Sequence, residues 1–499
     1  MSNHLKFFNT KSRSVEEFSA TGPVKIYTCG PTVYDFAHIG NFTAYVYWDI
    51  LVRTLEANGY KTRRVMNITD VGHLASDADE GQDKLEKAAS RDNKTVWEIA
   101  EYFTDDFLKH FAALNCREPV IRDKASGEYR DGLAKATDYI FEGQELIKKL
   151  ITKGVIYSTS DGLYFDTAQF PRYADFARLD LKGMEAGARI GENAEKRNPS
   201  DFAVWKFIKK DENHAMQWPL PPEIQSAVEI DKSDLLLNDS GAILGYPGWH
   251  LECSAVIHSE LGEPIDIHCG GIDHIPVHHT NEIAQSEVAF DRELSHFWLH
   301  NNFITVEGEK MAKSAGNFLT FADILEKGFD YMDFRMWVLQ GHYESERNFS
   351  WENLEHARNL RHKWLAVAAL RHQGQKDQQI ALFGDVKQSI LHHFSNNLST
   401  SGGIMEIDKV MERIHQGTID RADFDFASFL EFVDDLTGLN LLGSTPDIPK
   451  EAYDIIKQRL EARKNKDWAE SDRLRSEIQE KHNLTLTDTT HKTFWSYSI

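Results

Sequence analysis

The fold of this chain is decided by the segment VKIYTCGPTVYDFAHIGN, which spans residues 24–41. Residues 24–29 have the β-branched and aromatic side chains of a short buried strand, which ends at Gly30-Pro31. From Gly40 onward, apolar side chains recur at helical spacing, and residues 61–70 predict a second strand with its exit. A strand, a glycine loop, a helix and a strand in this order predict an α/β nucleotide-binding unit.

The ligands of such a unit bind at the carboxyl ends of its strands, where Cys29 and Thr69 fall. The loop before the helix suits a phosphate, because the N–H groups at a helix N-terminus carry partial positive charge. His38 adds a donor there, and Gly40 lets a nucleotide approach the backbone closely. A junction of this kind also occurs without a nucleotide, so both interpretations stay open on this motif alone.

The middle of the chain combines a thiol, an imidazole and a carboxylate within about thirty residues. Cys253 lies in the motif GWHLECSA, and His278 and Glu282 lie in VHHTNE. His278 and Glu282 are four residues apart, so on a helix they share a face. All three side chains are common zinc ligands, and Cys29 is the best candidate for a fourth. The alternatives are a small buried cysteine and an ordinary pair on a helix surface.

A strand-like run at residues 297–306 leads into the motif KMAKS at residues 310–314. Lys310 and Lys313 are three residues apart in a flexible loop. Two such lysines would clamp a triphosphate and neutralise the charge that develops as pyrophosphate leaves. The alternative is a solvated lysine pair.

The remaining segments predict a mixed first half and a helical second half. Residues 95–153 are predicted mostly helical, 157–166 a hairpin, 201–206 a strand and 211–246 a loop excursion without a clear period. After Asn317, helical spacing marks residues 321–339, 351–370, 380–398, 404–414 and 424–436. Residues 446–450 are typical of a linker, and a helical stretch at 451–481 precedes a hairpin that ends in Trp495.

The net charge of −22 over 499 residues argues against unspecific binding of nucleic acid, but it leaves room for a specific RNA partner. Four cysteines in so long a chain do not make a disulfide framework. No apolar run approaches the roughly 20 residues that span a bilayer, and the first residues lack the pattern of a signal peptide. We therefore expect a cytoplasmic protein with reduced thiols and no membrane contact.

Two of these motifs, HIGN at 38–41 and KMAKS at 310–314, resemble the HIGH and KMSKS signatures of class I aminoacyl-tRNA synthetases. Further motifs narrow the resemblance to the cysteinyl-tRNA synthetase family. They are CGPTVYD (29–35), GWHLECSA (248–255), HHTNEIAQ (278–285), GHY (341–343) and KDWA (466–469). The resemblance covers almost the whole chain.

The resemblance implies a Rossmann-like class I catalytic domain, followed by an all-α helical bundle and a small C-terminal domain. The catalytic domain is expected at residues 1–320, with an inserted connective domain at about 115–215 and the excursion at about 211–246. A stem-contact region at 321–375, a helical tRNA-binding bundle at 376–445 and an anticodon-binding unit at 451–499 are expected to follow. By the habit of the family, we expect a monomer.

The resemblance also implies the activity of a cysteine–tRNA ligase, which activates L-cysteine with ATP and Mg²⁺ and transfers it to tRNA(Cys). The implied ligands of one zinc ion, which would bind the substrate thiolate, are Cys29, Cys253, His278 and Glu282. The implied catalytic residues are His38, Asn41, Lys310 and Lys313. The implied ATP contacts are Gly30, His38, Gly40, Asn41, Lys310, Met311 and Lys313. The implied amino-acid contacts are Cys29, Thr69, Trp249 and Asp273, although Trp249 also suits a core aromatic. The candidate RNA contacts are Arg463, Lys464, Lys466 and Trp468, for which plain solvation is the alternative.

A metal would explain how cysteine is selected. Cysteine and serine are nearly isosteric, so an ordinary pocket discriminates poorly between them, whereas Zn²⁺ prefers a soft thiolate to a hydroxyl. We therefore expect no editing domain. His279 is expected beside the ligands, and Cys269 and Cys116 are expected outside the metal site.

The chain departs from the family in two places. Ala312 stands where the family usually has serine, and the stretch at 211–246 is longer than usual. Three rival functions stay open: a ligase that joins cysteine to an amino sugar but lacks the C-terminal tRNA-binding region, a zinc hydrolase, and a catalytically silent RNA-binding relative. The hydrolase leaves the lysine loop unexplained, and the intact His38, Asn41 and Lys313 argue against the silent relative.

Overall fold

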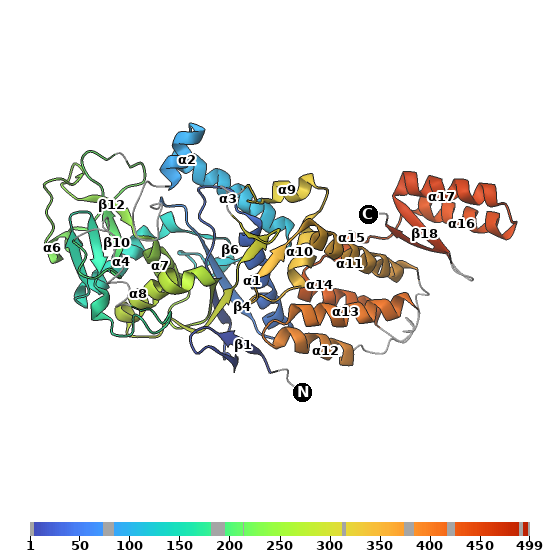
Figure 1. The fold of residues 1–499 in the computed structure, drawn as a ribbon, viewed down its shortest axis with the longest axis horizontal. Coiled ribbons are helices and arrows are strands. Elements are labelled where there is room, and N and C mark those ends of the chain that lie inside the picture. The colour runs from blue at the N-terminus through green and yellow to red at the C-terminus, as the bar shows by residue number, and fades with distance from the viewer. Residues whose placement is uncertain are drawn as a thin grey trace.

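The computed structural model describes residues 4–72, 84–180, 195–212, 214–311, 316–373, 384–416, 425–488 and 493–497. The molecule is elongated: an antiparallel sheet lies at one end, a parallel sheet in the middle, a group of helices next to it and a small C-terminal unit at the far end (Figure 1). This arrangement confirms the predicted fold class. None of the helices in these described ranges has the length and apolar character needed to cross a membrane.

The central sheet has five parallel strands in the order β14-β13-β3-β4-β7. Their bounds are Val24–Thr28 (β3), Thr62–Ile68 (β4), Ala134–Lys135 (β7), Ile265–Gly271 (β13) and Ser295–Asn301 (β14). The two strands predicted at 24–29 and 61–70 are β3 and β4, and helix α1 (Ile39–Ala57) connects them as expected. Every residue of β3 except Lys25 is buried, as in a sheet that is covered on both faces.

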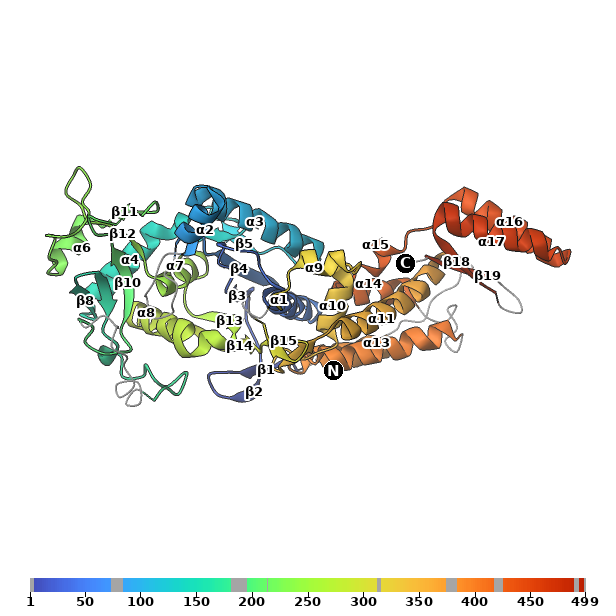
Figure 2. The same cartoon turned by 45° about the horizontal axis from the view of Figure 1, so that its top comes forward.

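Helices and a hairpin cover this sheet. Figure 2 shows α2 (Lys84–Asp92) and α3 (Val96–Ala113) together above the central strands. The N-terminal hairpin of β1 (Lys6–Asn9) and β2 (Ser14–Glu17) lies on the other side, next to β14. The backbone N–H of Thr10 donates to the carbonyl of Trp298 in β14 (2.9 Å), so the turn of the hairpin is fixed to this strand.

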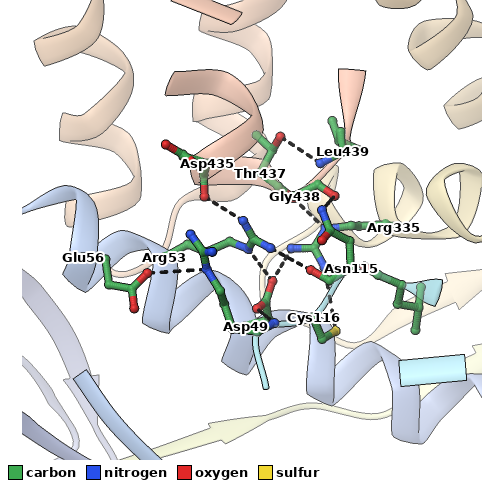
Figure 3. Close-up of polar contacts among 12 residues, drawn as sticks. Asp49, Arg53, Glu56, Asn115, Cys116, Arg335, Asp435, Thr437, Gly438 and Leu439 are labelled. Carbon is green, nitrogen blue, oxygen red and sulfur yellow. Dashed lines mark hydrogen bonds and ion pairs between the residues drawn. The ribbon is translucent and has the colours of Figure 1, made fainter. Parts of the chain in front are cut away.

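A buried polar node joins α1 to the helical half of the chain (Figure 3). Asp49 of α1 accepts hydrogen bonds from Arg53 Nε (2.7 Å) and from Arg335 Nη2 of α10 (Tyr331–Leu339). Arg335 Nε also donates to the carbonyl of Thr437 (2.6 Å), the last residue of α14 (Phe426–Thr437). Asp49 and Arg335 are both fully buried. The helix that begins at the predicted phosphate loop is therefore anchored to two helices of the second half.

Most of the stretch 95–153 is helical as predicted, but residues 114–135 interrupt it with non-helical structure. The elements found before α4 (Ile140–Thr152) are the short strands β5 (Val120–Arg122), β6 (Tyr129–Asp131) and β7. Asp123 Oδ1 accepts the backbone N–H of Ser126 (2.7 Å), and Gly127 adopts a left-handed conformation with φ of 74°. Side chains that bind their own turn compete with helix formation, which explains the difference.

The second sheet is antiparallel, with strands in the order β11-β12-β10-β9-β8. Their bounds are Ile156–Thr159 (β8), Gly162–Phe165 (β9), Phe202–Phe207 (β10), Trp218–Pro219 (β11) and Leu244–Pro247 (β12). The predicted hairpin at 157–166 and the strand at 201–206 are confirmed. The predicted loop at 211–246 is wrong in part, because it contains β11, α6 (Pro222–Ala227) and most of β12. These pieces are too short to show a period, and Trp218 pairs with the distant Gly245.

The second half is helical, as predicted. The remaining helices are α9 (Phe321–Glu326), α11 (Trp351–Ala369), α12 (Gly384–Ser395), α13 (Thr400–His415), α15 (Leu441–Ser444), α16 (Lys450–Lys464) and α17 (Trp468–His482). The single helix predicted at 321–339 is two helices, because Gly328 with φ of 78° ends α9. Lys466 with φ of 60° likewise divides the stretch at 451–481. The predicted last hairpin is formed by β18 (Leu484–Asp488) and β19 (Thr493–Tyr497).

Candidate active site and metal centre

A cavity of about 690 Å³ opens at the carboxyl ends of β3, β4 and β13. It lies where ligands bind in parallel α/β sheets. Twelve residues singled out from the sequence line it: Cys29, Gly30, His38, Gly40, Asn41, Thr69, Trp249, Cys253, Asp273, His278, Lys310 and Met311. The structure therefore brings the first motif, the middle motifs and the start of the lysine loop to one place.

His38 caps helix α1 and faces this cavity. Its Nδ1 accepts the backbone N–H of Asn41 (3.2 Å), while Asn41 Oδ1 accepts the backbone N–H of His38 (3.1 Å). Burial lowers the pKa of His38 to about 4, although the carboxylate of Asp273 acts in the opposite direction. A neutral ring that accepts at Nδ1 carries its proton on Nε2. The predicted donor is thus the Nε2–H group.

Two glycines bring the backbone close to the cavity. The N–H of Gly30 donates to Asn67 Oδ1 (2.8 Å), and a Cβ at this position would lie 1.7 Å from the Asn67 carbonyl oxygen. A Cβ at Gly40 would lie 2.8 Å from Cε1 of His38. A side chain at either position would clash with Asn67 or His38 and displace the first motif. Steric crowding therefore explains why glycine stands at both positions.

The lysine loop follows β15 (Ile304–Val306) and β16 (Glu309–Lys310). Lys310 and Met311 line the cavity, and Lys313 lies outside the described residues. After the loop, the Phe318 ring packs edge-on against His38, with ring centroids 5.2 Å apart, and the N–H of Ile39 donates to the carbonyl of Leu319 (3.0 Å). The chain that leaves the lysine loop therefore contacts the residues that begin α1.

The four predicted metal ligands come together beside the cavity. Cys253 lies on α7 (Trp249–Glu260), and His278 lies in a π-helical turn (Ile275–His279) that leads into α8 (Thr280–Phe290), which contains Glu282. One ligand atom from each of Cys29, Cys253, His278 and Glu282 lies within 4.8 Å of all the others. Two thiols, an imidazole and a carboxylate in one buried cluster have the donor chemistry of a zinc site. The cluster therefore fits a metal ion.

A second set of four potential ligands, Cys29, His268, His279 and Glu282, overlaps the first among the described residues. His268 Nε2 lies 2.7 Å from Glu282 Oε2, and His279 Nε2 lies 3.3 Å from Cys29 Sγ. Cys253 and His278 of the first set line the cavity, which His268 and His279 do not. Three ligands of the first set, Cys29, Cys253 and His278, thus face the cavity. The two histidines of the second set support Glu282 and Cys29 from behind.

The ligands perturb one another electrostatically. The hydrogen bond with Cys29 lowers the pKa of Cys253, whereas burial and the neighbouring Cys253 raise the pKa of Cys29 well above its usual range. Burial disfavours the charge of Glu282, but His268 and His278 outweigh it and hold the pKa of this carboxyl far below its usual range. The cluster therefore holds negative charge on Glu282 and favours a thiolate at Cys253, both of which suit a cation.

The predicted amino-acid contacts lie next to these ligands. The half-buried Trp249 packs its ring 4.7 Å from the ring of His278 and lines the cavity, so it is not simply a core aromatic. Thr69 is buried, and its Oγ1 accepts a hydrogen bond from Asn67 Nδ2 (3.0 Å). Asp273 is exposed at the rim. A small polar ligand between them would meet both the metal ligands and the first motif.

Comparison with known proteins identifies the relatives of this chain. Residues 15–223 and 231–359 match the family described as tRNA synthetases class I (C) catalytic domain, and residues 445–495 match the cysteinyl-tRNA ligase anticodon binding domain. The cysteine–tRNA ligase of Treponema denticola is 37% identical over 98% of this chain and 99% of its own length. Cysteine–tRNA ligase 1 of Burkholderia lata is 38% identical over 95% of this chain and 93% of its own length.

The chain belongs to the class I cysteinyl-tRNA synthetase family. The fold agrees with this assignment. Mycobacterium tuberculosis methionyl-tRNA synthetase in complex with methionyl-adenylate matches 84% of this chain and 89% of its own chain, with a TM-score of 0.53 and 15% sequence identity.

The C-terminal unit of this cysteinyl-tRNA synthetase relative contains the four candidate RNA contacts. Trp468 exposes 58% of its surface, and the guanidinium of Arg463 lies 5.9 Å from the centre of its ring. Arg463 also pairs with Asp488 (2.9 Å), and Lys464 pairs with Glu461 (2.7 Å). Lys466 lies in the turn between the two helices. Trp468 is therefore an exposed aromatic ring, whereas Arg463 and Lys464 are each paired with a carboxylate.

The family motifs do not mark every residue of the cavity. The sequence reading missed several lining residues: Lys84, Leu85, Gly270, Gly271, His274, Asn301, Asn302, Phe303 and Glu346. The pairs at 270–271 and 301–302 directly follow or end the strands β13 and β14, so the rule that ligands bind at strand ends could have found them. Glu346 comes from a distant loop and has no such signal.

Proposed function

We propose that this protein is a cysteine–tRNA ligase, which activates L-cysteine with ATP and transfers it to tRNA(Cys). The observation that carries the proposal is the shared cavity. Cys29, Cys253 and His278 of the candidate metal centre line the same cavity as His38 and Lys310 of the two signature motifs. A thiol-selecting centre and a nucleotide-binding motif in one cavity suit the joining of cysteine to an adenylate.

The cofactor in this proposal is one zinc ion per chain, held by Cys29, Cys253, His278 and Glu282. When bound, zinc would supply a soft Lewis acid that attracts the thiolate of cysteine and discriminates against the hydroxyl of serine. The supporting observation is the donor set itself, with two thiols, an imidazole and a carboxylate within 4.8 Å of one another. Trp249 and Thr69 would hold the rest of the amino acid, and Asp273 at the rim suits its ammonium group.

In the first step, an oxygen of the cysteine carboxylate attacks the α-phosphorus of ATP, and the bond to the bridging oxygen breaks to release pyrophosphate. The Nε2–H of His38 and the backbone at Gly30 and Gly40 would orient the phosphates, and Asn41 would hold the ring of His38 in place. Lys310, with Met311 beside it, and Lys313 would stabilise the leaving phosphates together with Mg²⁺. Neither step needs a nucleophile from the protein, so positioning and charge stabilisation supply the catalysis.

In the second step, a hydroxyl of the terminal ribose of the tRNA attacks the acyl carbon, and AMP leaves. The anticodon end of the tRNA would be read by the C-terminal unit, where Arg463, Lys464 and Lys466 suit phosphates and Trp468 suits a base. The proposed working form is a monomer, as the resemblance to the family implies. A tRNA substrate points to the cytoplasm as the place of the reaction.

The test is acceptor specificity. The protein is incubated with ATP, Mg²⁺, zinc and radiolabelled cysteine, together with either a tRNA(Cys) transcript or an amino sugar. Label on the tRNA alone supports the proposal. Label on the amino sugar alone would assign the chain to the rival ligase, and the absence of both products would overturn the ligase function altogether.

A further inference from the structure

A chain of hydrogen bonds connects the candidate metal centre to the N-terminal hairpin. Cys29 Sγ lies 3.3 Å from His279 Nε2, and His279 Nδ1 lies 2.8 Å from His300 Nε2. His300 Nδ1 in turn lies 2.7 Å from the hydroxyl of Thr10. Cys29 directly follows β3, and His279 ends the π-helical turn before α8. His300 lies in β14, and Thr10 lies in the turn between β1 and β2, so the hydrogen bonds run from the end of a central strand to the hairpin beside β14.

The four groups are held firmly in a buried setting. Thr10 is 3% exposed, His279 fully buried and His300 5% exposed. Gly270 leaves the space for the His279 ring, since a Cβ there would lie 2.6 Å from its Cε1. The backbone N–H of Thr10 is bound to Trp298, whose ring packs 5.1 Å from that of His279. Each imidazole thus has one polar partner on each nitrogen and little freedom to turn.

The chemistry of a metal-bound thiolate fixes the direction of every bond. A thiolate only accepts hydrogen bonds, so His279 must donate from Nε2 and accept at Nδ1. His300 then donates from Nε2 and accepts at Nδ1, which leaves Thr10 as the donor at the end of the chain. Each ring thereby uses one nitrogen as a donor and the other as an acceptor, and each of these nitrogens has a polar partner. One arrangement of protons therefore satisfies all the groups.

We propose that Thr10 and His300 are positioning residues, which act through His279 to orient the Cys29 thiolate toward the metal. This inference rests on the metal centre of the proposed function and extends it to residues outside the family motifs. Groups behind metal ligands fix their orientation and donor strength, and their loss typically costs about 10- to 100-fold in metal affinity when they touch the ligand directly. Because Thr10 acts through two rings, the expected loss is about tenfold, the lower end of that range.

The experiment compares the zinc affinity of the full-length protein with that of three variants, by competition with a chromophoric chelator. Thr10→Val removes the hydroxyl and keeps the shape of the side chain, whereas Thr10→Ser keeps a hydroxyl. Ser12→Ala is the control, because it removes an exposed hydroxyl from the same hairpin. Thr10→Val should bind zinc about tenfold more weakly, and the other two should match the wild type. With Co²⁺ in place of zinc, the thiolate-to-metal absorption band of Thr10→Val should shift, a change that a mere loss of packing would not produce.

The outcomes distinguish a failure of the proposed metal centre from a failure of the role proposed for Thr10 and His300. If the wild type binds no metal, the proposed metal centre itself is wrong. If the wild type binds zinc and Thr10→Val has the same affinity and the same cobalt spectrum, this inference alone is overturned. If Thr10→Val loses the native circular dichroism spectrum, His300→Phe is measured in its place with the same expectation. A Ser12→Ala variant as weak as Thr10→Val would also contradict the inference, since the effect would then belong to the hairpin as a whole.

Discussion

His38 and Asn41 exchange two hydrogen bonds across the first turn of helix α1, from the N–H of Asn41 to Nδ1 of His38 (3.2 Å) and from the N–H of His38 to Oδ1 of Asn41 (3.1 Å). This pairing caps the start of the helix and leaves the Nε2–H of His38, which lines the cavity, as the donor of the ring. His38→Asn keeps a side chain that caps a helix but has no donor at the Nε2 position. We expect it to lower the rate of ATP–pyrophosphate exchange by about 10²- to 10³-fold, as for the loss of one donor to a developing negative charge.

Asn41→Ala provides the matched comparison, because it weakens the same cap and leaves the His38 ring in the protein. It should lower the helix stability by about 1 kcal/mol and reduce exchange less than His38→Asn does. Equal losses of exchange in the two variants would show that His38 acts only as a cap. Both are measured by pyrophosphate exchange and by thermal unfolding.

The burial of His38 also predicts how stability depends on pH. Its pKa is about 4 in the folded protein and about 6.5 when unperturbed, so between these values the unfolded chain binds more protons. This difference destabilises the fold as pH falls from about 6.5 toward 4, and it has no effect above that window. The melting temperature of the wild type should therefore fall more between pH 7 and pH 5 than that of His38→Asn. An identical fall in both proteins would contradict the assigned pKa.

The buried ion pairs around Asp49 predict that a substitution far from the cavity strongly lowers the free energy of unfolding. Asp49→Asn removes the charge that pairs with Arg335 and Arg53 in a fully buried setting. Breaking one side of a buried ion pair typically costs about 3–5 kcal/mol, because the remaining charge is left uncompensated. We expect a loss of that size in the free energy of unfolding, measured by chemical denaturation. The control is Asp92→Asn, which removes a carboxylate paired with Arg91 on the surface and should have little effect.

The exposed Trp468 provides a test of the tRNA-binding end. Trp468→Ala should raise the KM for tRNA about tenfold or more, since the stacking of one base on an aromatic ring contributes about 1–3 kcal/mol. ATP–pyrophosphate exchange needs no tRNA and should stay unchanged. Phe141→Ala removes a similarly exposed aromatic of helix α4, which is 66% exposed, and should affect neither reaction. An effect of Trp468→Ala on exchange would place its role in folding rather than in RNA binding.

The four candidate metal ligands were predictable because their chemistry is unusual. Two thiols, an imidazole and a carboxylate in short motifs suggest a metal site beside blander alternatives, and the resemblance to the family selects the set of four. The structure brings Cys29 to Cys253 although they are far apart in the sequence. The strand, loop and helix at 24–57 were predictable because local periodicity decides them. Both predictions rest on signals that a few consecutive residues contain.

The parts that could not be predicted depend on distant partners. Thr10 and His300 are 290 positions apart, and nothing around either residue marks it as part of a site. The turn at Asp123 and the short strands of residues 211–246 have no period, because side-chain hydrogen bonds and non-local pairing form them. Short sequence motifs therefore indicate the candidate ligands of the site. The residues that hold those ligands in place, such as Thr10 and His300, are recognised only from the folded structure.

The most direct test of the central claim is ATP–pyrophosphate exchange with cysteine and with serine, on the wild type and on Cys253→Ser, with the metal content measured in parallel. We predict exchange with cysteine alone, one zinc ion per wild-type chain, and the loss of both zinc and exchange in Cys253→Ser. Exchange that persists in a zinc-free variant, or a wild type that accepts serine as readily as cysteine, would contradict selection of the thiolate by the metal.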